Sequence, residues 1–205
     1  MRYRSLKFSV LLLNFLFISV FGFSQSTVKK DLFNHLITRV KGDLNKDGIP
    51  DQATVFQDTV NDQSPYRLQV LFGKPGGDYQ LVMTSLKAIS PQYPGGKNGY
   101  VDGGGFRSLE IKSNVLTINV DLLRGGFCNK FRYQNGNFEL IGYTGGFSDG
   151  QGSMYHTDYN LSTGLLLETK ENYETGKMLS NTRKIVKVRP LPKLRDFEPE
   201  SEVYH

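Results

Sequence analysis

Cysteine and histidine are scarce in this chain of 205 residues, and tryptophan is absent. The scarcity of cysteine and histidine limits which covalent bonds and catalytic groups the chain can form. The single cysteine, Cys128, excludes an intramolecular disulfide bond, because such a bond needs two thiols. There are three histidines, of which His205 is the last residue, so few imidazoles are present to act as a general base. Tryptophan is absent, but 14 phenylalanines and 11 tyrosines can build a core, and 22 glycines favour a turn-rich β protein.

Residues 1–24 have the pattern of a signal peptide. Three basic residues precede an apolar run over residues 8–21, and the small residues at 22 and 24 predict cleavage before Gln25. The apolar run is shorter than the ~20 residues that a membrane-spanning helix needs. We therefore expect an exported protein, periplasmic or extracellular, with no membrane span in the mature chain.

Cleavage would leave a mature chain with little net charge. Arg2, Arg4 and Lys7 account for three of the 25 basic residues, so the mature chain would carry 22 basic residues against 20 acidic ones. This balance gives no electrostatic reason to expect nucleic acid as a partner. The remaining length, about 180 residues, is enough for one β domain with its own core.

Residues 43–51 read Asp-Leu-Asn-Lys-Asp-Gly-Ile-Pro-Asp and place oxygen-bearing side chains at loop positions one, three, five and nine. Gly48 stands at position six, where the backbone must turn sharply. Calcium prefers about six to eight oxygen ligands, which such alternation can supply. The loop therefore predicts a structural calcium ion with the ligands Asp43, Asn45, Asp47, Asp51 and the backbone carbonyl of Ile49. The alternative is a turn without metal, since Asp, Asn and Gly also favour ordinary turns.

The loop within residues 42–56 resembles the calcium loop of FG-GAP/VCBS repeats, which occur in integrin-like propellers and many secreted bacterial proteins. The resemblance implies that the loop leads directly into a β-strand, and residues 52–56 have the composition of a strand. An EF-hand is excluded, because position twelve is Thr54 where that motif needs a bidentate glutamate. One copy of the loop is present, so we do not expect a full β-propeller.

The rest of the chain predicts a mainly β fold, a single antiparallel sheet domain over residues 25–189. Asn135-Gly136 predicts the clearest hairpin, because both residues tolerate the positive φ of a tight turn. Further strands are expected from alternating or β-favouring composition, at 66–72, 79–83, 106–113 and 115–122 and in a meander over 155–188.

Two segments at the ends of this domain are expected to differ from it. Apolar residues at three- and four-residue spacing over 27–40 predict a short N-terminal helix, with a partly extended segment as the alternative. Proline, basic and then acidic residues over 190–205 predict a C-terminal tail that is flexible or packs late.

Three other places hold candidate functional residues. His156 and Asp158 share one side of a predicted strand and could form a metal site or a base with its orienting carboxylate, but no nucleophile motif accompanies them. Cys128 is expected to be a strand residue rather than a nucleophile paired with His156. Asp149 lies in a glycine-rich turn without alternating oxygens, so a second calcium site is not expected.

Residues 94–105 form a second glycine-rich stretch. It lacks the Lys-Ser/Thr pair of a phosphate-binding loop, because Lys97 is followed by Asn98, and a surface loop is expected. Our hypothesis for a ligand surface here is stacking on Tyr93, Tyr100 and Phe106.

Together these features favour an exported calcium-binding β protein that acts as a binding or envelope-associated module. Its partner would be a ligand or a protein, with a glycan as one candidate. The alternative is a secreted hydrolase acting on glycan or peptide, whose catalytic carboxylates the sequence does not identify. A hydrolase needs paired carboxylates facing a cleft, whereas a binding module needs an exposed aromatic patch.

Overall fold

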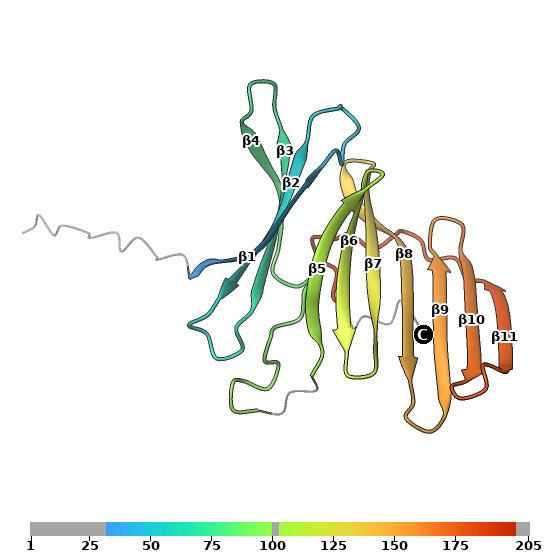
Figure 1. The fold of residues 1–205 in the computed structure, drawn as a ribbon. Helices are drawn as coiled ribbons and strands as arrows, with labels where there is room; N and C mark the ends of the chain where they lie inside the picture. The colour runs from blue at the N-terminus through green and yellow to red at the C-terminus, as the bar shows by residue number, and fades with distance from the viewer. Residues whose placement is uncertain (1–31, 100–102, 200–205) are drawn as a thin grey trace, which may run out of the picture. The chain divides into compact units, whose positions relative to one another are not determined.

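Two antiparallel sheets contain all the strands of the described residues, 32–99 and 103–199, in the computed structural model of the chain (Figure 1). The first sheet has the order β1-β2-β3-β4, with bounds Phe33–Gly42, Asp51–Asp58, Tyr66–Gly73 and Tyr79–Ser85. The second has the order β11-β10-β9-β8-β7-β6-β5. Its bounds, from β5 to β11, are Gly105–Lys112, Val115–Leu122, Gly125–Gln134, Asn137–Ser148, Ser153–Asn160, Leu165–Asn172 and Met178–Ile185.

Strands that follow one another in sequence are neighbours within each sheet, because short turns connect them. Asn135 and Gly136 join β7 to β8 with φ values of 52° and 73°, which confirms the predicted hairpin. Gly164 and Gly176, at φ values of 82° and 65°, occupy the turns of the predicted C-terminal meander. The mainly β prediction is thus confirmed.

The predicted N-terminal helix is wrong for the part of it that the structure describes. Residues 33–42 form β1, which pairs with β2 through eight partners from Phe33–Asp58 to Gly42–Asp51. The apolar residues that suggested a helical stripe do not share a buried face, since Leu36 and Ile37 are 41% and 38% exposed. Pairing with a buried strand outweighs helical spacing in such a short segment.

The prediction of a single sheet is also wrong. The connection from β4 to β5, residues 86–104, is long enough to separate two sheets, and no hydrogen-bonded ladder joins β4 to β5. Residues 94–99, 103 and 104 of the glycine-rich stretch expected as a surface loop lie outside the strands, and Gly105 begins β5. The chain therefore forms two layers where composition alone suggested one.

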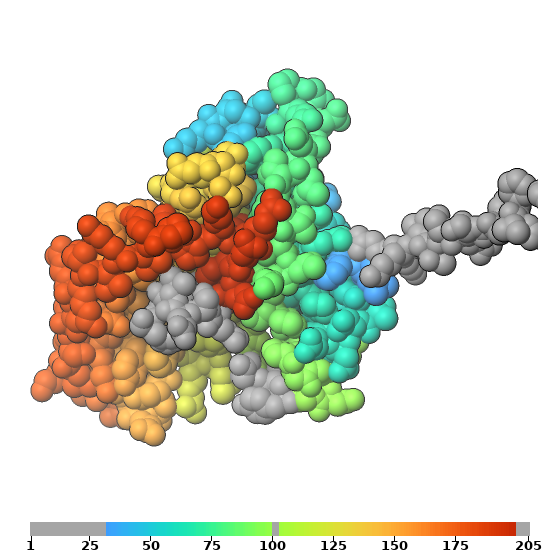
Figure 2. Space-filling model, turned by 180° about the vertical axis from the view of Figure 1, so that it is seen from behind, coloured from blue at the N-terminus to red at the C-terminus, as the bar shows by residue number. Residues whose placement is uncertain are grey.

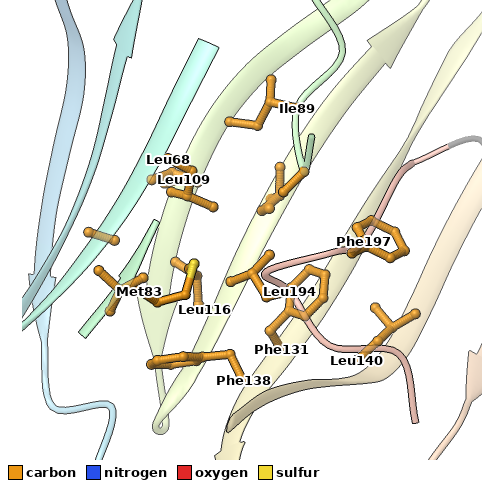
Figure 3. Close-up of a cluster of buried hydrophobic side chains, with 14 of the residues drawn as sticks. Leu68, Met83, Ile89, Leu109, Leu116, Phe131, Phe138, Leu140, Leu194 and Phe197 are labelled. Atoms are coloured by element: carbon orange, nitrogen blue, oxygen red, sulfur yellow. The ribbon is translucent and has the colours of Figure 1, made fainter. Parts of the chain in front are cut away.

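The core lies between the two sheets. Leu68 and Met83 of the first sheet face Leu109 and Leu116 of the second, all four of them buried (Figure 3). Ring contacts also cross the interface, because the ring centres of Phe72 of β3 and Tyr133 of β7 lie 5.0 Å apart. Burial of this apolar surface is the main contribution that holds the layers together.

The C-terminal segment, residues 186–199, completes this core. It runs across the second sheet toward the first (Figure 2). The amide N–H of Leu140 donates to the Pro192 carbonyl and that of Leu194 to the Phe138 carbonyl, each at 2.8 Å. Leu194 is fully buried. Of the two alternatives for the tail, packing therefore applies to residues 190–199.

Some expectations lie outside the described residues. These are the signal peptide at 1–24, the first part of the predicted helix, Tyr100, and residues 200–205. Over 32–99 and 103–199, no helix is long and apolar enough to cross a membrane.

Candidate functional site

The candidate calcium loop connects β1 to β2. β1 ends at Gly42 and β2 begins at Asp51, so the predicted strand follows the loop directly. Gly48 has a φ of 82° and Lys46 a φ of 69°, which makes the loop turn twice through the left-handed region. Glycine at position six is thus explained by the backbone, because other residues adopt that conformation at a cost.

The side chains at loop positions one, three and five are turned back over the loop's own backbone. Asp43 accepts hydrogen bonds from the amides of Lys46 at 2.6 Å and Gly48 at 3.1 Å. Asn45 Oδ1 accepts from the amide of Asp47 at 3.0 Å, and its Nδ2 donates to Asp47 Oδ2 at 2.8 Å. Asp47 Oδ1 accepts from the Ile49 amide at 2.7 Å. The side chains of Asn45 and Asp47 are therefore in contact, and all three side chains accept hydrogen bonds from amides of the loop itself.

Asp51 occupies a different environment, because its side chain is fully buried. Its Oδ2 accepts from the amides of Leu44 at 2.7 Å and Asn45 at 3.2 Å, and its Oδ1 accepts from the amide of Gly73 at 2.9 Å. A Cβ at Gly73 would lie 2.5 Å from the Pro50 carbonyl oxygen, so the loop packs directly on the end of β3. Asp51 thus fastens the loop to the neighbouring strand.

Two further contacts hold the loop against the rest of the fold. The Leu44 side chain is fully buried in the core. The side-chain amide of Asn114, in the turn between β5 and β6, donates to the Asp43 carbonyl at 2.8 Å. The loop is therefore anchored to both sheets, while Lys46, Asp47 and Gly48 remain exposed.

The donor set suits calcium in its chemistry, because carboxylate, amide and carbonyl oxygens are hard ligands. Asp51 Oδ1 accepts one hydrogen bond, so it keeps a lone pair with which it could bind an ion. The described residues hold no cluster of three or more His, Cys, Asp or Glu side chains placed for a metal ion. The side chains of Asn45 and Asp47 are in contact, and the Asp51 carboxylate accepts from the amides of Leu44 and Asn45.

The other predicted residues do not assemble into a catalytic site. His156 and Asp158 are exposed on β9 and share one side of it. Cys128 is opposite Thr144 of β8, which is opposite Asp158, so β8 lies between Cys128 and the strand of His156. Strands two places apart are separated by about 10 Å, too far for a thiol–imidazole contact.

Asp149 closes a turn in the structure. Backbone hydrogen bonds from Gln151 at 2.7 Å and Ser153 at 3.0 Å lower the pKa of its carboxyl group. Of the hypothesised stacking residues, Phe106 packs against Tyr66 of β3 at 5.7 Å and is partly buried against the core. Phe106 thus helps to join the sheets.

A cluster of rings lies on the second sheet, and the sequence analysis missed it; Phe147 is exposed and the other three rings are partly buried. We call it the aromatic face; it consists of Phe127, Tyr143, Phe147 and Tyr155. Phe147 and Tyr155 stack at 4.9 Å with an angle of 8°, and Phe127 and Tyr143 lie 5.8 Å apart. Burial raises the pKa of Tyr143, with a smaller contribution from Cys128, so its hydroxyl stays protonated at neutral pH. Only the strand register reveals that these residues are neighbours.

Comparisons of this chain with models of protein families, with curated proteins and with solved structures gave no match.

Proposed function

We propose that this chain is an exported binding module in which a structural calcium ion stabilises the loop at residues 43–51. The pattern of residues 1–24 supports export. The observation that carries the calcium proposal is the loop conformation, in which the alternating side chains of Asp43, Asn45 and Asp47 all fold back onto loop amides around a turn at Gly48. The resemblance to FG-GAP/VCBS loops agrees with this assignment.

In this proposal the loop residues serve as the ligands of the calcium ion. Asp43, Asn45, Asp47 and the Ile49 carbonyl would hold the ion, with Asp51 as a further ligand that keeps its bonds to the loop amides. The ion would supply positive charge that offsets the repulsion among the aspartates. Because Leu44 and Asn114 tie the loop to both sheets, that stabilisation would extend to the whole domain.

The aromatic face offers a binding role one exposed ring, Phe147, which is 46% exposed and stacks on Tyr155. One open cavity of about 410 Å³ has two acids in its lining, Asp196 and Glu198. Both are exposed, and Glu198 pairs with Lys87 at 2.7 Å. A general acid needs a sheltered carboxyl group, so this cavity does not favour the hydrolase.

The calcium proposal is tested by thermal unfolding in calcium and in chelator. Calcium at about 100 times its dissociation constant adds about 2.7 kcal/mol, which for a domain of this size raises Tm by about 5–10 °C. Asp47→Ala should abolish the difference. The matched control is Asp158→Ala, which removes an exposed carboxylate outside the loop and should keep the difference. Equal Tm values of the unsubstituted protein in calcium and in chelator would refute the proposal.

A further inference from the structure

Three turns of the second sheet lie together at one end of it, which is the lower end in Figure 1. They join β6 to β7, β8 to β9 and β10 to β11, over residues 123–124, 149–152 and 173–177. Hydrogen bonds connect them to one another. The amide of Ser148 donates to the Arg124 carbonyl at 2.9 Å, and the amide of Tyr173 donates to the Gly152 carbonyl at 2.8 Å. The three turns therefore form one continuous border of the sheet.

Exposed apolar side chains line this border, and we call them the apolar rim. Leu122 lies opposite Gly125, and Gly125 lies opposite Phe147, so Leu122 and Phe147 project to the same side of the sheet with no side chain between them. All members of the rim are between 38% and 69% exposed; they are Leu122, Leu123, Phe147, Tyr173, Met178 and Leu179.

The opposite end of the same sheet has a different composition. Its turns, residues 113–114, 135–136 and 161–164, consist of Ser, Asn, Gly and Thr apart from the buried Leu161. The exposed large apolar residues at that end are Ile185 and Val186, at the close of β11. Turns that face water are normally polar, so the leucines and rings of the apolar rim indicate a partner at this end of the sheet.

Two cations and two acids stand in these three turns. Arg124 and Lys177 are both exposed, and each is next to a residue of the apolar rim in the sequence. The acids are Glu174, which is exposed, and Asp149, whose carboxylate accepts two backbone amides. The charges of the turns therefore balance.

We propose that the apolar rim docks on the surface of a zwitterionic phospholipid bilayer. Its apolar side chains enter the boundary between headgroups and acyl chains, where aromatic rings are also favoured, while Arg124 and Lys177 reach the phosphate groups. This inference rests on the proposed export and binding role and names the partner.

Charge complementarity and spacing select this partner. A zwitterionic headgroup offers a phosphate to Arg124 and Lys177 and an ammonium to Glu174, which matches the balanced charges of the turns. The apolar rim extends from β6 to β11, about 24 Å at the usual strand spacing, and polar turn residues separate its side chains. A fluid lipid surface admits such separate side chains one by one, whereas a second copy of the chain would need a contiguous complementary patch.

The test is sedimentation with vesicles of phosphatidylcholine and phosphatidylethanolamine. Both sheets and the C-terminal segment that packs on them lie within residues 33–199, so the chain from Gln25 onward is used, which leaves out the apolar run at 8–21. We expect this chain to sediment with the vesicles. Leu123→Ser and Tyr173→Ser should each weaken the partition about three- to tenfold. The matched control is Ile185→Ser, which removes a side chain that is 64% exposed at the opposite end of the sheet and should leave the partition unchanged.

Several results would overturn the proposal. These are no sedimentation with the vesicles, binding that requires added phosphatidylglycerol, or an equal loss in Ile185→Ser and Leu123→Ser. Sedimentation velocity of Leu123→Ser and of the unsubstituted chain tests the second copy as occupant, and a dimer that this substitution dissolves also overturns it. Melting curves confirm that each variant is folded. The calcium loop contacts Asn114, in a turn at the opposite end of the sheet, and its calcium binding is measured separately. Absent vesicle binding with intact calcium binding therefore refutes only the membrane assignment.

Discussion

Replacing Asp51 by asparagine separates two roles of this residue, as a calcium ligand and as an acceptor for backbone amides. The carboxylate is fully buried and accepts three N–H groups, from Leu44, Asn45 and Gly73. The substitution keeps one acceptor oxygen but turns an NH₂ group toward at least one backbone N–H. It also removes the negative charge that strengthens all three bonds.

The expected loss follows from the energies of such bonds. A hydrogen bond to a charged group contributes about 1.5–3 kcal/mol, and a buried donor left without a partner costs about 1–3 kcal/mol. We therefore expect Asp51→Asn to lower the free energy of unfolding by about 2–4 kcal/mol, and Asp51→Ala by somewhat more. Because these bonds need no ion, the loss should be present in chelator.

The assay is urea unfolding in chelator, monitored by tyrosine fluorescence and circular dichroism. Asp47→Ala serves as the control, since Asp47 is exposed and its loss should cost less than about 1 kcal/mol without calcium. An Asp51→Asn protein that matches the unsubstituted protein within about 0.5 kcal/mol in chelator would refute the structural role.

Two further predictions concern the C-terminal segment and the turn after β8. Leu194→Ala should destabilise the domain by about 2–5 kcal/mol in urea unfolding, because Leu194 is fully buried between the sheets; the control Lys193→Ala, at an exposed neighbour, should change little. Asp149 has a lowered pKa in the folded state, so its contribution is present above the unfolded pKa of about 4 and is lost as pH falls through the folded pKa. NMR titration of the Asp149 carboxyl group checks this, and a midpoint at or above that of an unfolded aspartate would contradict it.

Turn chemistry was predictable from the sequence because it is local. Asn135, Gly136 and Gly48 each adopt a positive φ, and the residue types at these positions already indicate a turn. β1 was not predictable in the same way. Its apolar spacing suits a helix, and only the strand at residues 51–58, beyond the loop, supplies the hydrogen-bonding partners that make it extended.

The candidate sites show the same difference between local features, which the sequence reveals, and long-range contacts, which it does not. The oxygens of Asp43, Asn45 and Asp47 could be read from their spacing. The burial of Asp51 could not, because its partner Gly73 is 22 residues away. The aromatic face depends on register over three strands, including a shift between Lys130 and Phe131 that sets which residues of β8 face which of β7. A shift of one residue would turn Phe147 to the other side.

The C-terminal segment has a consequence for the order in which this chain can fold. The ring centres of Phe197 and Phe131 lie 5.2 Å apart. The Ser85 hydroxyl donates a hydrogen bond to the Arg195 carbonyl, although the two residues are 110 positions apart in the sequence. Until these late residues are available, Phe131 and Leu140 lack part of their cover, so the earlier strands cannot close a complete core. Contacts of such long range are expected to make folding slow and to place it after synthesis of this segment. For the export proposed above, that delay would keep the chain unfolded for longer before it crosses a membrane.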